Sequence, residues 1–207
     1  MMFEPKKKVI SIGGIKVPVD PDFRIMCEYG AAAESKNTEA LRSIAERFYF
    51  AGLPHGVDGK MAADGMAEFY ADGIAPDRDR EDKKPSHKEP KKCFDFEEDE
   101  AYFYAAFLSE YGIDLEKVKL HWFTFCALFR GLPDECKLKR IIGIRAEELG
   151  DIKSGAEKAR VRKLKGVFAL KKNRPKRFKN AAERDAAMKA EYVERLRQVE
   201  EMMKNGS

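Results

Sequence analysis

The sequence predicts a mainly α-helical protein: an N-terminal β-hairpin plus helices, then a compact helical core and a C-terminal charged helix. Three observations lead to this fold class. Apolar residues recur at helical spacing in several segments, a Gly-Gly pair divides two alternating stretches, and large aromatic residues concentrate in residues 94–170. Apolar residues make up 43% of the chain and charged residues 37%, so we expect one well-formed core under a very polar surface.

The first 75 residues are expected to form a hairpin followed by helices. Residues 9–19 alternate around Gly13-Gly14, a pair suited to the two-residue turn of a hairpin. An Asp within residues 20–22 provides an N-cap for a helix, and Pro21 suits its first turn. Two further amphipathic patterns follow, with apolar positions at Leu41, Ile44, Ala45 and Phe48, and at Ala62, Met66, Phe69, Tyr70 and Ile74.

The domain boundaries follow from a change in composition. Residues 76–93 are rich in Pro and charge and nearly lack apolar side chains, so they cannot bury enough surface to fold. We therefore predict a charged flexible linker at 76–93, between an N-terminal domain, 1–75, and a helical aromatic core domain, 94–171. Residues 172–207 are predicted to hold a basic loop and a C-terminal amphipathic helix.

Capping signals place the helices of the core domain. Asp95 with Glu98 forms a capping-box pattern for the first helix. Asp114 is expected to begin a second helix that runs to Arg130 and carries Trp122, the only tryptophan. Ser154, followed by Glu157, is expected to cap the last helix of this region. Leu138, Ile141, Ile142 and Leu149 are expected to line one face of the helix between these two.

No catalytic, cofactor-binding or metal-binding residue is predicted, and we do not expect an enzyme. His55, His87 and His121 are far apart, and no constellation of nucleophile, base and orienting group is apparent. The acidic run 97–100 is interpreted as a solvated first helical turn rather than a metal site, because consecutive residues point to different sides of a helix. Trp122 and its aromatic neighbours are interpreted as core rather than a ligand pocket.

The sequence also predicts a soluble cytoplasmic protein. The four cysteines show no CxxC spacing, which favours reduced thiols over a disulfide framework. No N-terminal apolar signal core and no membrane-length apolar run is present, so we expect no membrane contact.

A basic patch precedes the C-terminal segment. Residues 153–179 contain twelve Lys or Arg against one acid, Glu157, although the net charge of the chain is only +4. Such a patch can contact nucleic acid phosphates or serve as a solvated or protein-binding face. The second interpretation is favoured, because interleaved aromatic residues are sparse. The residues of the patch are Arg160, Arg162, Lys163, Lys165, Lys171, Lys172, Arg174, Lys176 and Arg177.

The C-terminal segment carries a narrow apolar stripe on an otherwise charged helix. The stripe recurs every three or four residues, which is typical of a coiled-coil seam or a docking helix rather than a core helix. It is therefore predicted to bind a partner or a second copy. Its residues are Met188, Tyr192, Leu196, Val199 and Met203.

Five stretches within residues 9–170 resemble a known family. They are the hairpin followed by DPDFRIMCEY (20–29), FDFEEDEAYFYAAFLSEYGIDL (94–115), LHWFTFCALFRGLP (120–133), IIGIRAEEL (141–149) and ARVRKLKGVFAL (159–170). Together these stretches resemble the tail assembly chaperones of phages and prophages, from long-tailed phages of Gram-positive bacteria.

The resemblance implies a non-enzymatic phage protein that binds the tape-measure protein and assists tail tube assembly. Its expected partners are the phage tape-measure protein, the tail tube protein as a further candidate, and other copies of the same chain. Its expected location is the cytoplasm of the infected or lysogenic host, with none retained in the mature virion. Two alternatives stay open: a nucleic-acid-binding phage protein using residues 158–179, and a structural tail component retained in the virion.

Overall fold

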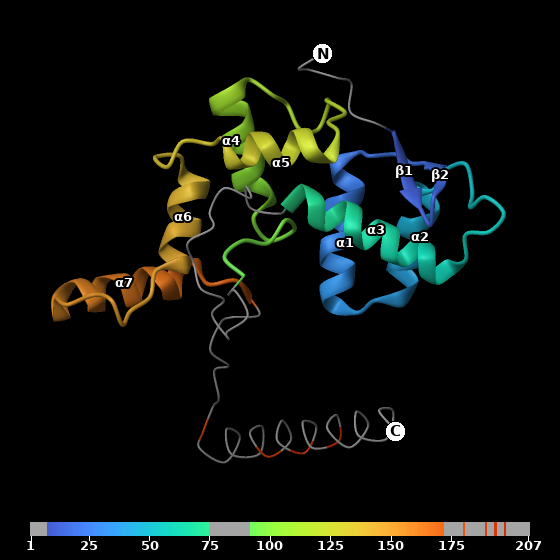
Figure 1. Ribbon diagram of the computed structural model, residues 1–207. Helices are drawn as coiled ribbons and strands as arrows, with labels where there is room; N and C mark the ends of the chain where they lie inside the picture. The colour runs from blue at the N-terminus through green and yellow to red at the C-terminus, as the bar shows by residue number, and fades with distance from the viewer. Residues whose placement is uncertain are drawn as a thin grey trace. The chain divides into compact units, whose positions relative to one another are not determined.

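The computed structural model describes residues 8–74, 92–171 and four further positions, 180, 189, 193 and 197. The chain divides into two compact units, Met1–Lys171 and Lys172–Ser207. The described part of the first unit contains a two-stranded hairpin and seven helices (Figure 1). The predicted mainly helical fold with an N-terminal hairpin is therefore confirmed.

The hairpin joins β1 (Val9–Ile12) and β2 (Ile15–Pro18) in antiparallel register, with Ile12 opposite Ile15. Gly13 and Gly14 both have positive φ, +56° and +82°, as a type I′ turn requires at its two central positions. A hairpin alone is marginally stable in water. This one is stabilised by packing against α3 (Gly59–Ile74), which buries the Ile12 side chain.

The N-terminal helices begin where short polar side chains cap them. In α1 (Phe23–Ser35), the Asp22 carboxylate accepts a hydrogen bond from Arg24 N at 3.0 Å, which confirms a cap within residues 20–22. In α2 (Thr38–Phe48), the Asn37 side chain accepts from Ala40 N. Both caps satisfy first-turn N–H groups that have no partner within the helix.

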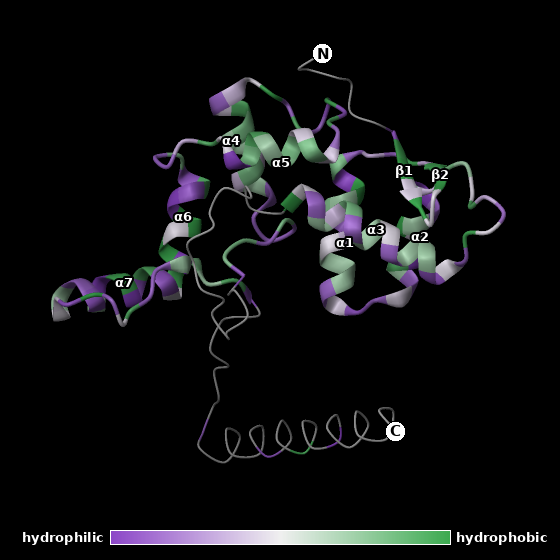
Figure 2. Ribbon diagram, in the orientation of Figure 1, coloured by the Kyte–Doolittle hydropathy of each residue, from purple (hydrophilic) through white to green (hydrophobic). Residues whose placement is uncertain are grey.

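The aromatic region forms four helices. They are α4 (Glu100–Tyr111), α5 (Trp122–Arg130), α6 (Lys137–Ala146) and α7 (Gly155–Phe168). Figure 2 shows apolar residues concentrated along α4 and α5, whereas α7 is mostly hydrophilic. α7 packs against α6, and Ser154 Oγ accepts from Glu157 N at 3.4 Å, so the predicted cap of this last helix is confirmed.

The helix expected from Asp114 to Arg130 is wrong in its first half, because α5 begins only at Trp122. The Arg24 guanidinium donates to the carbonyl oxygens of Leu115 and Val118 at 2.6 and 3.1 Å. Phe23 N donates to Leu120 O at 3.0 Å. Several carbonyl groups of this segment therefore find their partners in α1, while Lys117 N and Val118 N close a single local turn on Asp114 O.

The predicted capping box at Asp95 also needs correction. Asp95 Oδ1 accepts from Glu97 N and Glu98 N at 2.9 and 3.0 Å, but it caps the turn at 96–99 that leads into α4, whose own N-cap position is Asp99. The Glu98 carboxylate does not close the box, since it accepts from Lys171 N at 2.8 Å. The N–H group of Asp95 is bonded by the Asp99 carboxylate instead, at 3.0 Å.

The helix expected to carry Leu149 ends earlier, at Ala146. Leu138 and Ile141 are buried as expected, and Ile142 is half-buried. Leu149 lies beyond the helix in a turn.

One hydrophobic core includes residues from both described ranges, from Ile12 in the hairpin to Leu138 in α6. Most of the predicted linker, 76–93, lies outside the described residues. Trp122 is fully buried, and its Nε1 donates to Tyr70 O at 3.1 Å. The contact depends on Gly73, where a Cβ atom would lie 2.0 Å from Trp122 Nε1. The sequence interpretation of Trp122 as a core residue is thus confirmed by its burial.

Candidate functional site

A groove of about 700 Å³ opens between α1, the start of α4 and residues 115–116. Its floor is aromatic. Phe23 and Phe125 stack with ring centroids 4.6 Å apart, and Phe96 and Phe103 approach each other at 5.2 Å. This size and composition lie within the range of sites that bind the side chains of a ligand or peptide.

Helical spacing places the two long walls. On α1, the lining residues Cys27, Glu28 and Ala31 follow Phe23 by four, five and eight positions, so they share one face. On the opposite wall, Glu100, Ala101 and Tyr104 line the first turns of α4. The two walls bring together parts of the chain that are about seventy residues apart in sequence.

The rim of the groove is acidic. Glu28, Glu97, Glu100 and Glu116 are all exposed there. Glu28 pairs with Arg47 of α2. Within residues 8–74 and 92–171, no ion pair involves the carboxylates of the other three. Arg24 also lines the groove, but its guanidinium is bound by Asp22 and by backbone carbonyls, so the rim attracts cationic partners.

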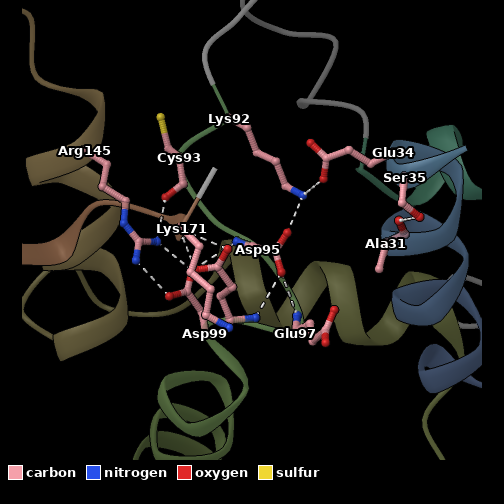
Figure 3. A network of polar contacts seen from close by, with 11 residues as sticks. Ala31, Glu34, Ser35, Lys92, Cys93, Asp95, Glu97, Asp99, Arg145 and Lys171 are labelled. Atoms are coloured by element: carbon pink, nitrogen blue, oxygen red, sulfur yellow. Dashed lines mark hydrogen bonds and ion pairs between the residues drawn. The ribbon is translucent and has the colours of Figure 1, made fainter. Parts of the chain in front are cut away.

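A buried ion pair fixes the wall that carries Glu97 (Figure 3). Arg145 of α6 binds the Asp99 carboxylate through two hydrogen bonds of 2.6 and 2.9 Å, and Asp99 is only 1% exposed. The same guanidinium donates to Cys93 O at 3.1 Å and Phe168 O at 2.6 Å. Among the described residues, no buried side-chain N or O atom lacks a hydrogen-bond partner, which is the condition for tolerating a buried charge pair.

A second polar contact links this wall to the end of α1. The Lys92 ammonium pairs with Asp95 Oδ2 at 2.7 Å and with the Glu34 carboxylate. Burial alone would raise the pKa of Asp95, but hydrogen bonds from Lys92 and from two backbone N–H groups hold it below its ordinary value. Segment 92–99 is therefore fixed by charged contacts from α1 and α6. Lys92 falls within the predicted linker, yet its side chain is bound on both sides.

The chemistry of the groove favours binding. Burial raises the pKa of the Cys27 thiol well above its usual value, with a smaller effect from Cys126, so the thiol is neutral at pH 7 and forms part of an apolar floor. Among the described residues, no three His, Cys, Asp or Glu side chains gather as a metal-ligand set. In the same part of the chain, no helix is long and apolar enough to cross a membrane.

The structure separates the predicted basic patch into groups with different roles. Arg160, Arg162 and Lys163 are exposed on α7. Lys165 is half-buried, and its ammonium donates to Arg145 O at 3.0 Å and to Glu147 O. Lys171 is exposed, and its N–H group binds Glu98. The remaining members, Lys172, Arg174, Lys176 and Arg177, lie outside the described residues.

The predicted partner-binding stripe lies outside the described residues, so it stays a prediction. Its members are Met188, Tyr192, Leu196, Val199 and Met203. Three neighbouring positions, Lys189, Val193 and Arg197, are described as helical and exposed.

The groove was not predicted from the sequence. One wall had a visible signal, since Glu97, Glu100, Ala101 and Tyr104 recur at three- and four-residue spacing. The pattern was interpreted as a solvated helix start next to a core. No local signal indicated that α1 and residues 115–116 would complete a concave site.

Comparison with known proteins identifies a family. Residues 32–170, more than half of the chain, match the family described as Bacteriophage Gp15 protein, and the matched span includes all of α4 to α7. Searches of curated proteins and of solved structures give no match. The phage character implied by the sequence resemblance is thereby confirmed. The chain belongs to the bacteriophage Gp15 protein family.

Proposed function

We propose that this protein is a tail assembly chaperone that binds the tape-measure protein and assists tail tube assembly without catalysing a reaction. The observation that carries the proposal is the aromatic groove with its acidic rim, in a helical protein of a bacteriophage family. A chaperone needs a surface that holds apolar segments reversibly, and the apolar lining of this groove supports that role.

The groove favours one kind of partner segment. An amphipathic helix inserts apolar side chains at positions i, i+3 or i+4, and i+7 into a hydrophobic groove. Four aromatic side chains form the floor here, and Glu97, Glu100 and Glu116 border it. The segment of the tape-measure protein that binds should therefore carry an apolar face flanked by Lys or Arg, because basic flanks match the rim.

Co-expression with the tape-measure protein of the same phage, followed by pull-down, tests the proposal. The native chain should retain the tape-measure protein and keep it soluble. The variant Glu97→Lys/Glu100→Lys should reduce retention by about tenfold or more, because two rim charges change sign. Glu68→Lys/Asp72→Lys on α3 is the matched control: it changes the net charge equally at exposed positions outside the groove.

Two results would contradict the proposal. One is a native chain that fails to retain the tape-measure protein in this assay. The other is mass-spectrometric detection of this chain in purified virions at the copy number of a structural tail protein, since a chaperone leaves the finished particle.

A further inference from the structure

We infer that the exposed face of α7 in one copy docks into the groove of a second copy. The α7 face is defined by Arg160, Lys163 and Val167, three exposed positions separated by three and four residues on one side of the helix. Val167 is 61% exposed and gives this cationic face one apolar contact point. The occupant of the groove is thus a second copy of this chain.

Charge complementarity supports the pairing. The α7 face places Arg160 and Lys163 beside Val167. Arg160 lies 3.8 Å from Glu157 of the same helix, but this exposed pair is weak. Across the groove, Glu97, Glu100 and Glu116 border an aromatic floor. An apolar residue between cations therefore meets an apolar floor between anions, an arrangement that favours association and fixes its orientation.

The α7 face is a short, compact surface. α7 has 14 residues, and the stretch from Arg160 to Val167 is two turns, about 10 Å long. Small residues, Ala156, Ala159 and Gly166, are exposed beside this stretch, so the helix can approach an aromatic floor closely. These small residues allow close approach of α7 to the groove, whereas Arg160, Lys163 and Val167 make the specific contacts.

Within one copy, α7 does not occupy the groove. No α7 residue lines it, and the helix is held elsewhere: Arg145 Nε donates to Phe168 O at 2.6 Å, and Lys165 Nζ donates to Arg145 O at 3.0 Å. The contact must therefore form between copies. Because two different surfaces meet, the interface is heterologous, and association continues into a ring or an open chain of copies.

This inference goes beyond the proposed function, because self-association is measured without any tape-measure protein. It also suggests what covers the groove when no tape-measure segment is bound. A tape-measure segment with an apolar face flanked by Lys or Arg, as on α7, would displace the α7 of a neighbouring copy.

Sedimentation velocity of the purified full-length chain tests the inference. An interface formed by one helix is small and weak, so the protein is measured up to about 200 µM, at salt concentrations of about 50 and about 500 mM. We expect concentration-dependent association at low salt and a shift toward monomer at high salt. Glu97→Lys/Glu100→Lys and, separately, Arg160→Glu/Lys163→Glu should each weaken association by about tenfold or more.

Exchanging the charges of the groove rim and the α7 face provides the decisive experiment. A chain carrying all four substitutions should associate again, because an acidic α7 face then meets a basic rim. Mixing the two double variants should also restore association, as alternating copies, because the basic rim of one variant meets the acidic α7 face of the other and the two unchanged surfaces still match. Glu68→Lys/Asp72→Lys and Lys16→Glu/Lys60→Glu are controls at exposed positions outside both surfaces, and circular dichroism confirms that every variant is folded. The milder Glu97→Gln/Glu100→Gln replaces Glu97→Lys/Glu100→Lys if that variant fails to fold, and Arg160→Gln/Lys163→Gln replaces the α7 variant in the same way.

Several results would overturn the inference. They are a native chain that stays monomeric at low salt, association that neither double variant affects, or association abolished by deleting residues 181–207 while the groove and α7 variants leave it unchanged. Retention on DNA at about 50 mM salt, lost in Arg160→Glu/Lys163→Glu and accompanied by no self-association, would assign the α7 face to nucleic acid instead.

Discussion

Two different kinds of contact stabilise the two ends of the hydrophobic core. Where α3 meets α5, the contact is steric and apolar: Trp122 fits against Gly73 with no room for a methyl group. Where α6 meets the entry to α4, the contact is ionic: Arg145 and Asp99 form a buried, bidentate pair. The comparison teaches that the wall carrying Glu97 depends on charged contacts, whereas the packing of Trp122 beside the groove floor depends on shape.

The largest expected effect is at the ionic end. Arg145→Met should lower the free energy of unfolding by about 3–5 kcal/mol, because it leaves the Asp99 carboxylate buried without a counter-charge. Urea denaturation followed by circular dichroism measures the loss. The double variant Arg145→Met/Asp99→Leu should recover most of it, because it removes both charges. A double variant as unstable as the single one would show that the guanidinium acts mainly through Cys93 O and Phe168 O.

The steric end should be next in size. Gly73→Ala is expected to cost about 1–3 kcal/mol of unfolding free energy, because the new methyl group overlaps the Trp122 indole. Thermal unfolding measures the change. Gly143→Ala on α6 is the matched control, since a Cβ atom there meets nothing within 4 Å, and it should be neutral or stabilise the helix by about 0.5–1 kcal/mol. Equal destabilisation by both variants would contradict the steric explanation.

A smaller effect, specific to the ionic end, is expected from pH. The folded state holds the pKa of Asp95 below its ordinary value. This carboxylate therefore contributes stability above its unfolded pKa of about 4, and the contribution is lost as pH falls through the lower folded value. Asp95→Asn should flatten the fall in unfolding temperature in this acidic range. An unchanged slope would show that Asp95 does not contribute to the acid sensitivity.

Local rules predicted the elements whose signals lie within a few residues. The Gly13-Gly14 turn, a cap at Asp22 and the cap at Ser154 were all confirmed. Long-range contacts explain the failures. The helix expected from Asp114 does not form, because Arg24, about ninety residues earlier, binds the carbonyl groups of that segment.

The groove escaped prediction for the same reason. Asp99 and Arg145 are separated by 46 residues, and no periodicity in the sequence pairs them. The sequence showed that the patch is basic, but it did not show which of its side chains face solvent and which bind the backbone. Arg160 and Lys163 face solvent, whereas Lys165 points inward to two carbonyl groups of the α6 end. Sequence therefore predicted which residues are charged or apolar, and tertiary contacts decided which of them form the site.

The position of Trp122 gives the protein an intrinsic optical probe. It is the only indole in the chain, it is fully buried, and its ring lies 5.9 Å from both Phe96 and Phe125 in the groove floor. Its fluorescence emission thus comes from one defined location directly beneath the docking surface. Binding at the groove of a partner that lacks tryptophan can therefore be followed by this signal in the native, unlabelled chain.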